Sequence, residues 1–259
     1  MESDLISDKT KIIADWDFFE SEGLRLRLFM ARQDKKGQFP LVLINHGGGG
    51  MDNTYEQMAT HLASLGYVAA CLNFRGYYGS EGRQGYGKGE ITDILNLVDF
   101  LKTKGYVDIK RIGMFGYSRG GHHALLAAEK TDDFKVLVTW SAPVDVFELS
   151  ILHSFIIDLV GGTPEELPEE YYIRSPINFV EKITCPLLII HGEEDIVVPP
   201  QHAIRLANRL EQLGKYFEFN ILHGEEHTLG HGGFNRAWKD TVNFLNRFLQ
   251  PASRPPGCE

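Results

Sequence analysis

One serine in this chain lies in a pattern typical of a nucleophile. The stretch GYSRGG, Gly116 to Gly121, reads G-x-S-x-G and lies between an apolar run and a run that favours helix. A sharp strand-to-helix turn at such a site holds the serine in a sparsely populated backbone conformation and lifts its Oγ above the sheet edge. The glycines leave room for the segments that cross at the turn, since a Cβ there would collide. Ser118 is therefore the predicted nucleophile.

A nucleophilic serine needs a base, and the base needs an acid to orient it. The segment His191 to Pro200, HGEEDIVVPP, follows an apolar run, and Asp195 lies where its loop begins. The segment Leu222 to Gly230, LHGEEHTLG, follows the last predicted strand and holds His227 in mid-loop. Loops that follow parallel strands meet at one edge of a sheet, so we expect Asp195 and His227 to meet Ser118 there.

Other polar side chains in the same two loops offer alternatives. Glu193 and Glu194 are alternative acids, although solvated loop charges would show the same pattern. His223, His227 and His231 have a spacing that would suit zinc on a helix. The intervening glycines oppose a helix, and no glutamate follows His223 as it would in a zinc-protease motif. We therefore predict no metal site.

A second glycine-rich segment offers donors for the negative charge that develops during acyl transfer. NHGGGGMDN, Asn45 to Asn53, ends an apolar run, and its glycines let backbone N–H groups approach an oxyanion without side-chain interference. We predict the Gly48 amide as the donor from this loop, with Gly47 and Gly49 as alternatives, and the Arg119 amide as the second donor. A phosphate-binding loop is disfavoured because the Gly-Lys-Ser/Thr ending is missing. We expect no cofactor.

These residues depend on a repeated pattern of strands and helices. Short apolar runs without polar alternation indicate strands that are buried on both faces of a parallel sheet. They are Pro40 to Asn45, Tyr67 to Phe74, Arg111 to Gly116, Lys135 to Trp140 and Pro186 to Gly192, and Phe217 to Leu222 adds a last strand. Helical patterns lie at 55–65, 91–102, 121–129, 201–213 and 234–249. The opening runs, 12–21 and 24–32, alternate as antiparallel edge strands do.

Strand, helix, strand in repetition is the signature of the α/β class. The sequence therefore predicts a mostly parallel central sheet with an antiparallel N-terminal edge and helices on both faces. The length is compatible with a single domain over 1–259.

Two segments are too long for ordinary connections, and long ordered loops are usually functional. The first, 75–90, is rich in Gly and Tyr. Its tyrosines Tyr77, Tyr78 and Tyr86 are candidates to wall a substrate pocket, Tyr77 and Tyr78 being the predicted substrate contacts, with surface turns as the alternative. The second, 143–183, contains ILHSFIIDLV and predicts a small cap insertion whose Phe155 contacts the substrate. Burial of that apolar run against the domain would explain it equally well.

The composition limits the classes of partner. The net charge is −9 at pH 7, whereas nucleic-acid binding proteins gather Lys and Arg on one face, so a small-molecule substrate fits better. The polar start MESDLISDKTK lacks a signal-peptide pattern, and no apolar run approaches the roughly 18 residues of a membrane span. We expect a soluble, cytoplasmic protein, either monomer or homodimer. Cys71, Cys185 and Cys258 lack paired spacing, which favours reduced thiols.

Together these motifs resemble the α/β-hydrolase fold, and more narrowly the catalytic domain of the prolyl oligopeptidase family and its stand-alone esterase relatives. The likeness covers nearly the whole chain, through NHGG, NFRGYYGSEG, GYSRGG, GGTPEE, RSPINFVEKITCPLLIIHGEEDIVVPP and HGEEHTLG. It implies the roles of nucleophile, acid and histidine for Ser118, Asp195 and His227. The resemblance also implies an oxyanion role for Gly48.

The residue after the nucleophile departs from this pattern. Family members often carry Tyr there, whereas this chain has Arg119, and its glycine run is also longer than usual. We expect the Arg119 side chain to pair with an acidic neighbour such as Glu81 or Glu194. A substrate carboxylate is the alternative partner.

The resemblance implies a serine hydrolase that works through an acyl-enzyme. Peptidases of the family carry a β-propeller, and the roughly forty residues before the first core strand cannot hold one. We therefore expect cleavage of carboxylic esters with short-chain or aryl acyl groups. An aminopeptidase or acyl-peptide hydrolase is the alternative. A hydrolase-like binding protein without turnover is a further one.

Overall fold

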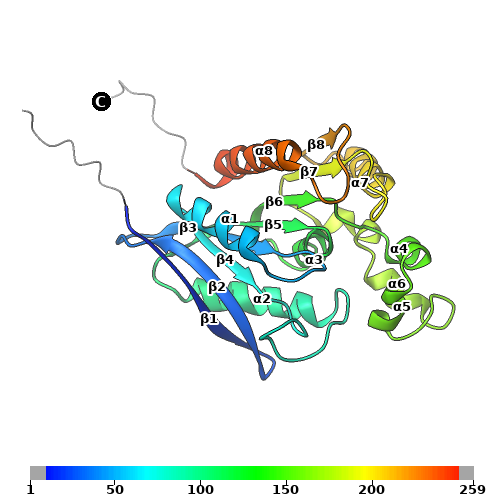
Figure 1. Ribbon diagram of the computed structural model, residues 1–259, viewed down its shortest axis with the longest axis horizontal. Coiled ribbons are helices and arrows are strands. Elements are labelled where there is room, and N and C mark those ends of the chain that lie inside the picture. The colour runs from blue at the N-terminus through cyan, green and yellow to red at the C-terminus, as the bar shows by residue number, and fades with distance from the viewer. Residues whose placement is uncertain (1–9, 251–259) are drawn as a thin grey trace, which may run out of the picture.

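The computed structural model describes residues 10–250. The expectations for the two ends of the chain and for Cys258 lie outside these residues. The strands are β1 (Ile12–Ser21), β2 (Leu24–Gln33), β3 (Phe39–Asn45), β4 (Val68–Leu72), β5 (Val107–Tyr117), β6 (Phe134–Trp140), β7 (Leu187–Gly192) and β8 (Phe217–Leu222). They form one sheet in the order β1-β2-β4-β3-β5-β6-β7-β8, in which β3 to β8 run parallel (Figure 1).

Helices connect the parallel strands. The longer ones are α1 (Asn53–Ser64), α2 (Gly89–Lys102), α3 (Arg119–Ala128), α7 (Gln201–Gln212) and α8 (His231–Leu249). Shorter ones are α4 (Val146–Leu152), α5 (Phe155–Val160), α6 (Pro168–Ile173) and the 3-10 turns Pro176–Asn178 and Val180–Lys182. Every predicted strand and helix is present. Helices α1, α2 and α3 begin two residues before the predicted positions, α8 begins three residues before, and β5 begins four residues before.

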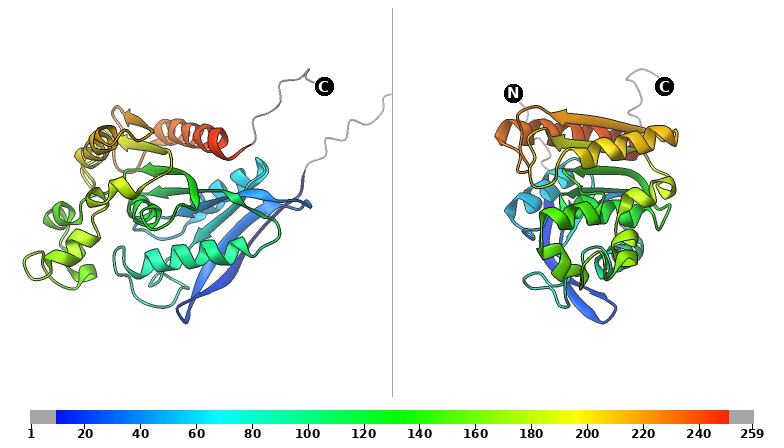
Figure 2. Two further views of the ribbon diagram at one scale, coloured as in Figure 1. Left: turned by 180° about the vertical axis from the view of Figure 1, so that it is seen from behind. Right: turned by 90° about the vertical axis from the view of Figure 1, so that its right-hand side faces the viewer.

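The central strands feed two cores, one on each face of the sheet. Along β3, Leu41 and Leu43 enter one core, while Val42 and Ile44 enter the other. Helices α2, α3 and α7 pack over the first core, and α1 and α8 pack over the second (Figure 2). Each buried side chain of this size contributes roughly 1.5–3 kcal/mol to stability. The strand ends that carry the candidate site are thus held from both sides.

The antiparallel edge predicted from the first third of the chain is confirmed. Strand β1 pairs antiparallel with β2, and β2 pairs antiparallel with β4. The period-two pattern of β2 places Leu26 and Leu28 in the core, where both are fully buried. The intervening Arg27 turns away from this core, and its guanidinium carbon lies 4.0 Å from the ring centre of Trp16. Over 24–28 the alternation therefore indicates one buried and one open face, whereas Phe29 and Ala31 farther along β2 are buried in the core on the other side of the sheet.

The predicted insertion at 143–183 folds as a group of short helices. Figure 1 shows α4, α5 and α6 standing together beyond one end of the sheet. Ile156 and Val160 are buried among these helices and belong to a separate apolar cluster. Among the described residues, no helix is long and apolar enough to cross a membrane. Cys71 and Cys185 are both free thiols, and Cys71 is buried.

Candidate active site

Ser118 lies at the sharp turn between β5 and α3. Its φ of 53° is in the left-handed region, which a serine adopts only when the surroundings hold it there. Its amide donates to the carbonyl of Trp140 over 2.7 Å. A Cβ at Gly116 would collide with the Gly120 carbonyl, and a Cβ at Gly120 would collide with the carbonyls of Asn45 and His46. These glycines allow β5, α3 and the end of β3 to approach closely.

The structure brings the three predicted residues together. Nε2 of His227 lies 2.9 Å from Oγ of Ser118, and Nδ1 of His227 lies 2.7 Å from Oδ2 of Asp195. Asp195 follows β7 and His227 follows β8, so both loops leave the carboxyl edge of the sheet, where β5 also ends. The Asp195 side chain is fully buried and the His227 side chain is 14% exposed. The histidine is thus open to a substrate while the acid is not.

Asp195 is held as a charged carboxylate. Its Oδ1 accepts hydrogen bonds from the amides of Val197 and Val198, at 2.9 and 2.8 Å. Burial opposes the charge, but the hydrogen bonds from His191 and His227 outweigh it, so the pKa of Asp195 falls below its usual range. A charged carboxylate holds the N–H of His227 on Nδ1 and leaves Nε2 free to accept a proton from Ser118.

His191 is a part of this network that the sequence analysis missed. Its Nε2 lies 3.2 Å from Oδ2 of Asp195 and 2.7 Å from the carbonyl of Val198. The ring is fully buried at the end of β7. Its position, four residues before the acid at a strand end, was the available signal.

The alternative acids lie elsewhere. Oδ2 of Asp195 contacts His227, whereas Glu193 contacts His223, with 3.0 Å between Oε2 and Nδ1. Two histidines of the alternative zinc motif, His223 and His227, therefore contact two different carboxylates. Among residues 10–250, no three His, Cys, Asp or Glu side chains gather in a way that would hold a metal ion.

Hydrogen bonds hold the glycine-rich loop in place and leave the Gly48 amide available as a donor. Nδ1 of His46 donates to the Gly47 carbonyl over 2.7 Å, and the Gly47 amide donates to the Tyr55 hydroxyl over 2.8 Å. Nε2 of His46 accepts from the amide of Phe74, so the ring is a neutral tautomer. Burial lowers the pKa of His46 to about 4. The Gly48 amide has no hydrogen-bond partner in the described chain, as an oxyanion donor requires.

The Arg119 amide is the second predicted donor. It is the first helical amide after Ser118, at the positive end of α3, and it donates to no other group among the described residues. The loop from 47 to 50, Ser118, Arg119 and His227 all line one cavity of about 430 Å³. The predicted donors and the predicted nucleophile thus share one space.

The three predicted substrate contacts fare differently. Phe155 lines the cavity, and its contact with a substrate stays a prediction. The prediction for Tyr78 is wrong, because its side chain is 91% exposed and points away into solvent from a tight turn. Tyr77 lies behind the cavity wall, where its hydroxyl donates to the Gly48 carbonyl over 3.1 Å. Tyr86, the third candidate of this loop, is buried with a positive φ and lines the cavity.

The expected acidic partner of Arg119 is also wrong. Its Nη1 donates to the hydroxyl of Tyr77 over 2.7 Å and to Oε1 of Gln84 over 2.6 Å. Glu81 instead accepts from the amide of Arg25 in the edge hairpin. Glu194 lies exposed on the acid loop and forms no ion pair within 10–250. Local turn geometry in 75–90 decided these partners.

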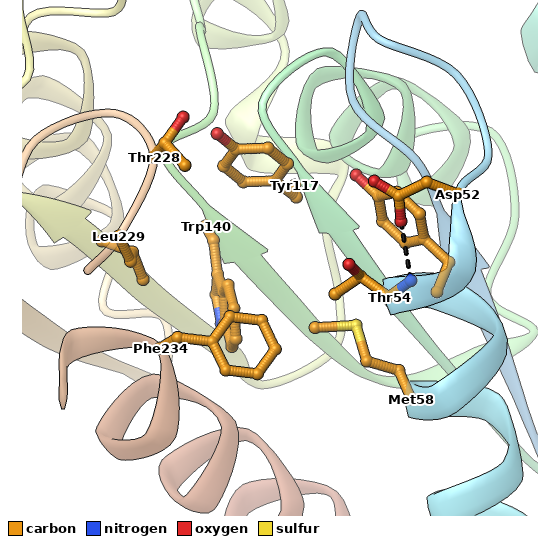
Figure 3. A pocket seen from close by; sticks show the side chains of 9 residues that line it. Asp52, Thr54, Met58, Tyr117, Trp140, Thr228, Leu229 and Phe234 are labelled. Carbon is orange, nitrogen blue, oxygen red and sulfur yellow. Dashed lines mark hydrogen bonds between the residues drawn. The ribbon is translucent and has the colours of Figure 1, made fainter. Parts of the chain in front are cut away.

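A smaller apolar cavity adjoins the first on the side of the histidine loop. Figure 3 shows Leu229, Trp140 and Phe234 on one side of it and Thr54 and Met58 of α1 on the other, with Thr228 near Tyr117. Tyr117 lies between the two cavities and lines both of them. The candidate site therefore has two compartments, one beside Arg119 and one beside the residues that follow His227.

The parallel sheet, the strained serine turn and the contacts of Ser118, His227 and Asp195 define an α/β-hydrolase of the serine type. A model of the prolyl oligopeptidase family of peptidases matches residues 53–252. The chain belongs to this family.

Individual relatives agree with that assignment. The chain is 33% identical over 204 residues to the uncharacterised peptidase YtmA of Bacillus subtilis, covering 76% of this chain and 79% of that one. It is 24% identical to acylamino-acid-releasing enzyme 1 of Oryza sativa, over 80% of this chain and 29% of the relative. The acylaminoacyl peptidase of Pyrococcus horikoshii superposes with a TM-score of 0.81 at 25% identity, over 97% of this chain and 44% of that one. The chain thus spans less than half of the last two.

Proposed function

We propose that this chain is a serine peptidase that cleaves amide bonds in short peptides or acylated amino acids. The contacts of 2.9 Å and 2.7 Å that join Ser118, His227 and Asp195 carry the proposal. The relatives named above are described as peptidases or as acylaminoacyl-releasing enzymes, and this favours amides over the carboxylic esters expected from the sequence. Esters remain alternative substrates of the same machinery.

The geometry supports an acyl-enzyme route. Oγ of Ser118 attacks the carbonyl carbon while its proton passes to Nε2 of His227. The carbonyl oxygen becomes an oxyanion, which accepts hydrogen bonds from the amides of Gly48 and Arg119. Fixed donors of this kind each contribute roughly 3 kcal/mol to transition-state stabilisation. Asp195 stabilises the imidazolium that forms.

The second half of the cycle reverses these roles. The imidazolium gives its proton to the leaving nitrogen, the C–N bond breaks and the acyl group remains on Oγ. Water then attacks the ester carbonyl, its proton passes to His227, and Oγ leaves with that proton. The products are a free amine and a free carboxylic acid.

Labelling with a fluorophosphonate tests the nucleophile. We expect a single adduct on Ser118, located by mass spectrometry of the digested protein. Ser118→Ala should lower kcat by on the order of 10⁴ to 10⁶, as the loss of a serine nucleophile does elsewhere. The exposed Ser154, outside the site's hydrogen-bond network, provides a matched Ser→Ala control that should label normally. An adduct on another residue, or a Ser118→Ala variant with near-normal turnover, contradicts the assignment.

A comparison of leaving groups tests amide against ester cleavage. We expect release of 4-nitroaniline from N-acylated and free aminoacyl anilides, in addition to hydrolysis of 4-nitrophenyl esters. The two kinds of anilide separate an acyl-peptide hydrolase from an aminopeptidase. Hydrolysis of the esters alone, with no anilide turned over, would overturn the peptidase proposal and favour an esterase.

A further inference from the structure

Arg119 carries a positive charge inside the candidate site without an acidic partner. Its side chain is buried, with 8% of the residue exposed, and it lines the same cavity as Ser118. Both of its protein acceptors, Tyr77 and Gln84, are neutral. A buried charge is costly unless it is paired, so charges in protein interiors normally have a counterion. Within 10–250 no carboxylate oxygen lies within the 4.0 Å of an ion pair with Arg119.

The unused N–H groups of Arg119 lie on the edge that suits a carboxylate. Nη1 makes both protein hydrogen bonds, which leaves Nε and Nη2 without an acceptor in the described chain. A Cβ at Gly48 would lie 3.8 Å from Nη2 and 3.9 Å from Nε. Because residue 48 has no side chain, the space next to this edge stays open. Nε and Nη2 together form the fork that binds a carboxylate through two parallel hydrogen bonds.

The acids nearest to this region are already engaged. Glu90, which is buried, accepts hydrogen bonds from the amides of Gly85, Gly87 and Lys88. Asp52 lines the cavity, but its Oδ1 accepts from the amide of Thr54 and caps α1. These carboxylates shape the loop of Tyr86 and the start of α1, and they leave the guanidinium unpaired.

The buried histidines around Arg119 are uncharged at neutral pH. Burial above all, together with the charge of Arg119, lowers the pKa of His122 to about 3. His123, with both ring nitrogens unpaired, also has its pKa lowered, first by burial and then by His122 and Arg119. Arg119 is therefore the lone cation on this wall of the cavity in the described chain.

The two compartments assign a side to each part of the substrate. His227 gives its proton to the leaving group, so the leaving group lies toward the apolar cavity of Thr228 and Leu229 (Figure 3). The acyl part then lies toward Arg119. There the guanidinium carbon is 5.0 Å from the ring centre of Tyr86 and 5.9 Å from that of Phe155. Both distances lie within the range of a cation–π attraction, which holds the guanidinium in place.

Building on the peptidase activity proposed above, we propose that Arg119 selects substrates whose acyl part carries a carboxylate, such as peptides cut after an acidic residue. The carboxylate accepts two hydrogen bonds, from Nε and Nη2, in the space above Gly48. It supplies the counterion that the described chain does not provide.

Two substrates that differ only in charge test this proposal. We compare N-acetyl-Glu-4-nitroanilide with N-acetyl-Gln-4-nitroanilide on the full chain. Wild type should prefer the Glu substrate by tenfold or more in kcat/KM, about the effect of a hydrogen bond to a charged group. Arg119→Met should abolish this preference, and Arg119→Lys should retain part of it. A substitution that lowers kcat/KM equally for both substrates leaves the Glu/Gln ratio of kcat/KM unchanged. A substitution that removes charge recognition lowers this ratio.

Controls separate a selective role from a structural one. Arg83→Met removes an exposed arginine of the same loop and should leave the Glu/Gln ratio at its wild-type value. Wild type without a preference for Glu, or an Arg119→Met variant that keeps the preference, overturns the proposal.

Binding to the Ser118→Ala variant keeps the test independent of turnover. Calorimetry with the same two anilides should show tenfold or tighter binding of the Glu compound, and Ser118→Ala/Arg119→Met should bind both alike. Equal affinities in Ser118→Ala overturn the proposal. Failure of the fluorophosphonate to label Ser118 in wild type would instead count against the peptidase function, even where the binding preference holds.

Discussion

At the scale of single residues, the candidate site depends on which tautomer His227 adopts. Asp195 accepts from Nδ1 and is itself held by two amides and by His191. Its lowered pKa keeps the carboxylate charged throughout the neutral range. The imidazole is thereby oriented before any substrate arrives, and no reorganisation is needed when the proton moves.

Asp195→Asn should lower kcat on an anilide substrate by about 10⁴, because an amide N–H₂ facing Nδ1 favours the wrong tautomer. Steady-state kinetics and the rate of fluorophosphonate labelling measure the effect. Glu193→Gln is the matched control, since Glu193 is on the same loop but pairs with the exposed His223. A loss of less than tenfold in Asp195→Asn, or an equal loss in the control, would show that another group orients His227.

At the scale of elements, the site depends on the crossing of β3, β5 and α3. The carbonyls at the end of β3 pass directly over Gly120, in the first turn of α3. This close approach is what aligns the oxyanion loop with Ser118. It is a backbone-to-backbone contact, so no side-chain movement could relieve an added methyl group.

Gly120→Ala should therefore cost about 3 kcal/mol or more of unfolding free energy, since an overpacked core site with an immobile backbone lies at the severe end of such changes. Urea denaturation followed by circular dichroism measures it. Gly105→Ala is the control, because a Cβ at Gly105 meets nothing within 4 Å. Equal stability of the two variants would mean that the turn tolerates a wider separation of β3 and α3.

At the scale of the whole molecule, one buried acid outside the site links pH to stability. Glu129 ends α3, is 7% exposed, and has one carboxyl oxygen without a partner. Burial raises its pKa from the usual 4.5 to about 8, although Lys130 and Lys182 act in the opposite direction. Between these values the folded chain holds a proton that the unfolded chain has lost. Stability therefore falls as pH rises from 4.5 to 8 and levels off above 8.

Glu129→Gln removes this titration, so its stability relative to wild type should increase across that range. The gain should approach about 1.4 kcal/mol for each pH unit crossed. Urea denaturation at pH 5, 7 and 9 measures the difference, and Glu211→Gln, which removes an exposed acid on α7, should show none. A Glu129→Gln gain that is already complete at pH 5 would show that the effect is not protonation.

The local signals in this sequence determined more than the class of fold. Uninterrupted apolar runs specify strands buried on both faces, and period two specifies the open edge, because a side chain's burial follows directly from its position in the strand. Gly116, Gly120 and Gly121 around Ser118 indicated the turn, because a Cβ at any of these positions would collide with a crossing segment. The loops of Asp195 and His227 follow from the topology, since parallel strands deliver their loops to one edge.

Only the tertiary structure decided the partners of side chains that are remote along the chain. Arg119 contacts Tyr77 and Gln84, 42 and 35 positions earlier, and no periodicity specifies such pairs. Tyr78 turned outward and Tyr86 inward because the positive-φ turns at Gly76, Gly79 and Gly87 set the path of the loop. A strand pattern fixes a face, but contacts between loops depend on the packing of the whole molecule.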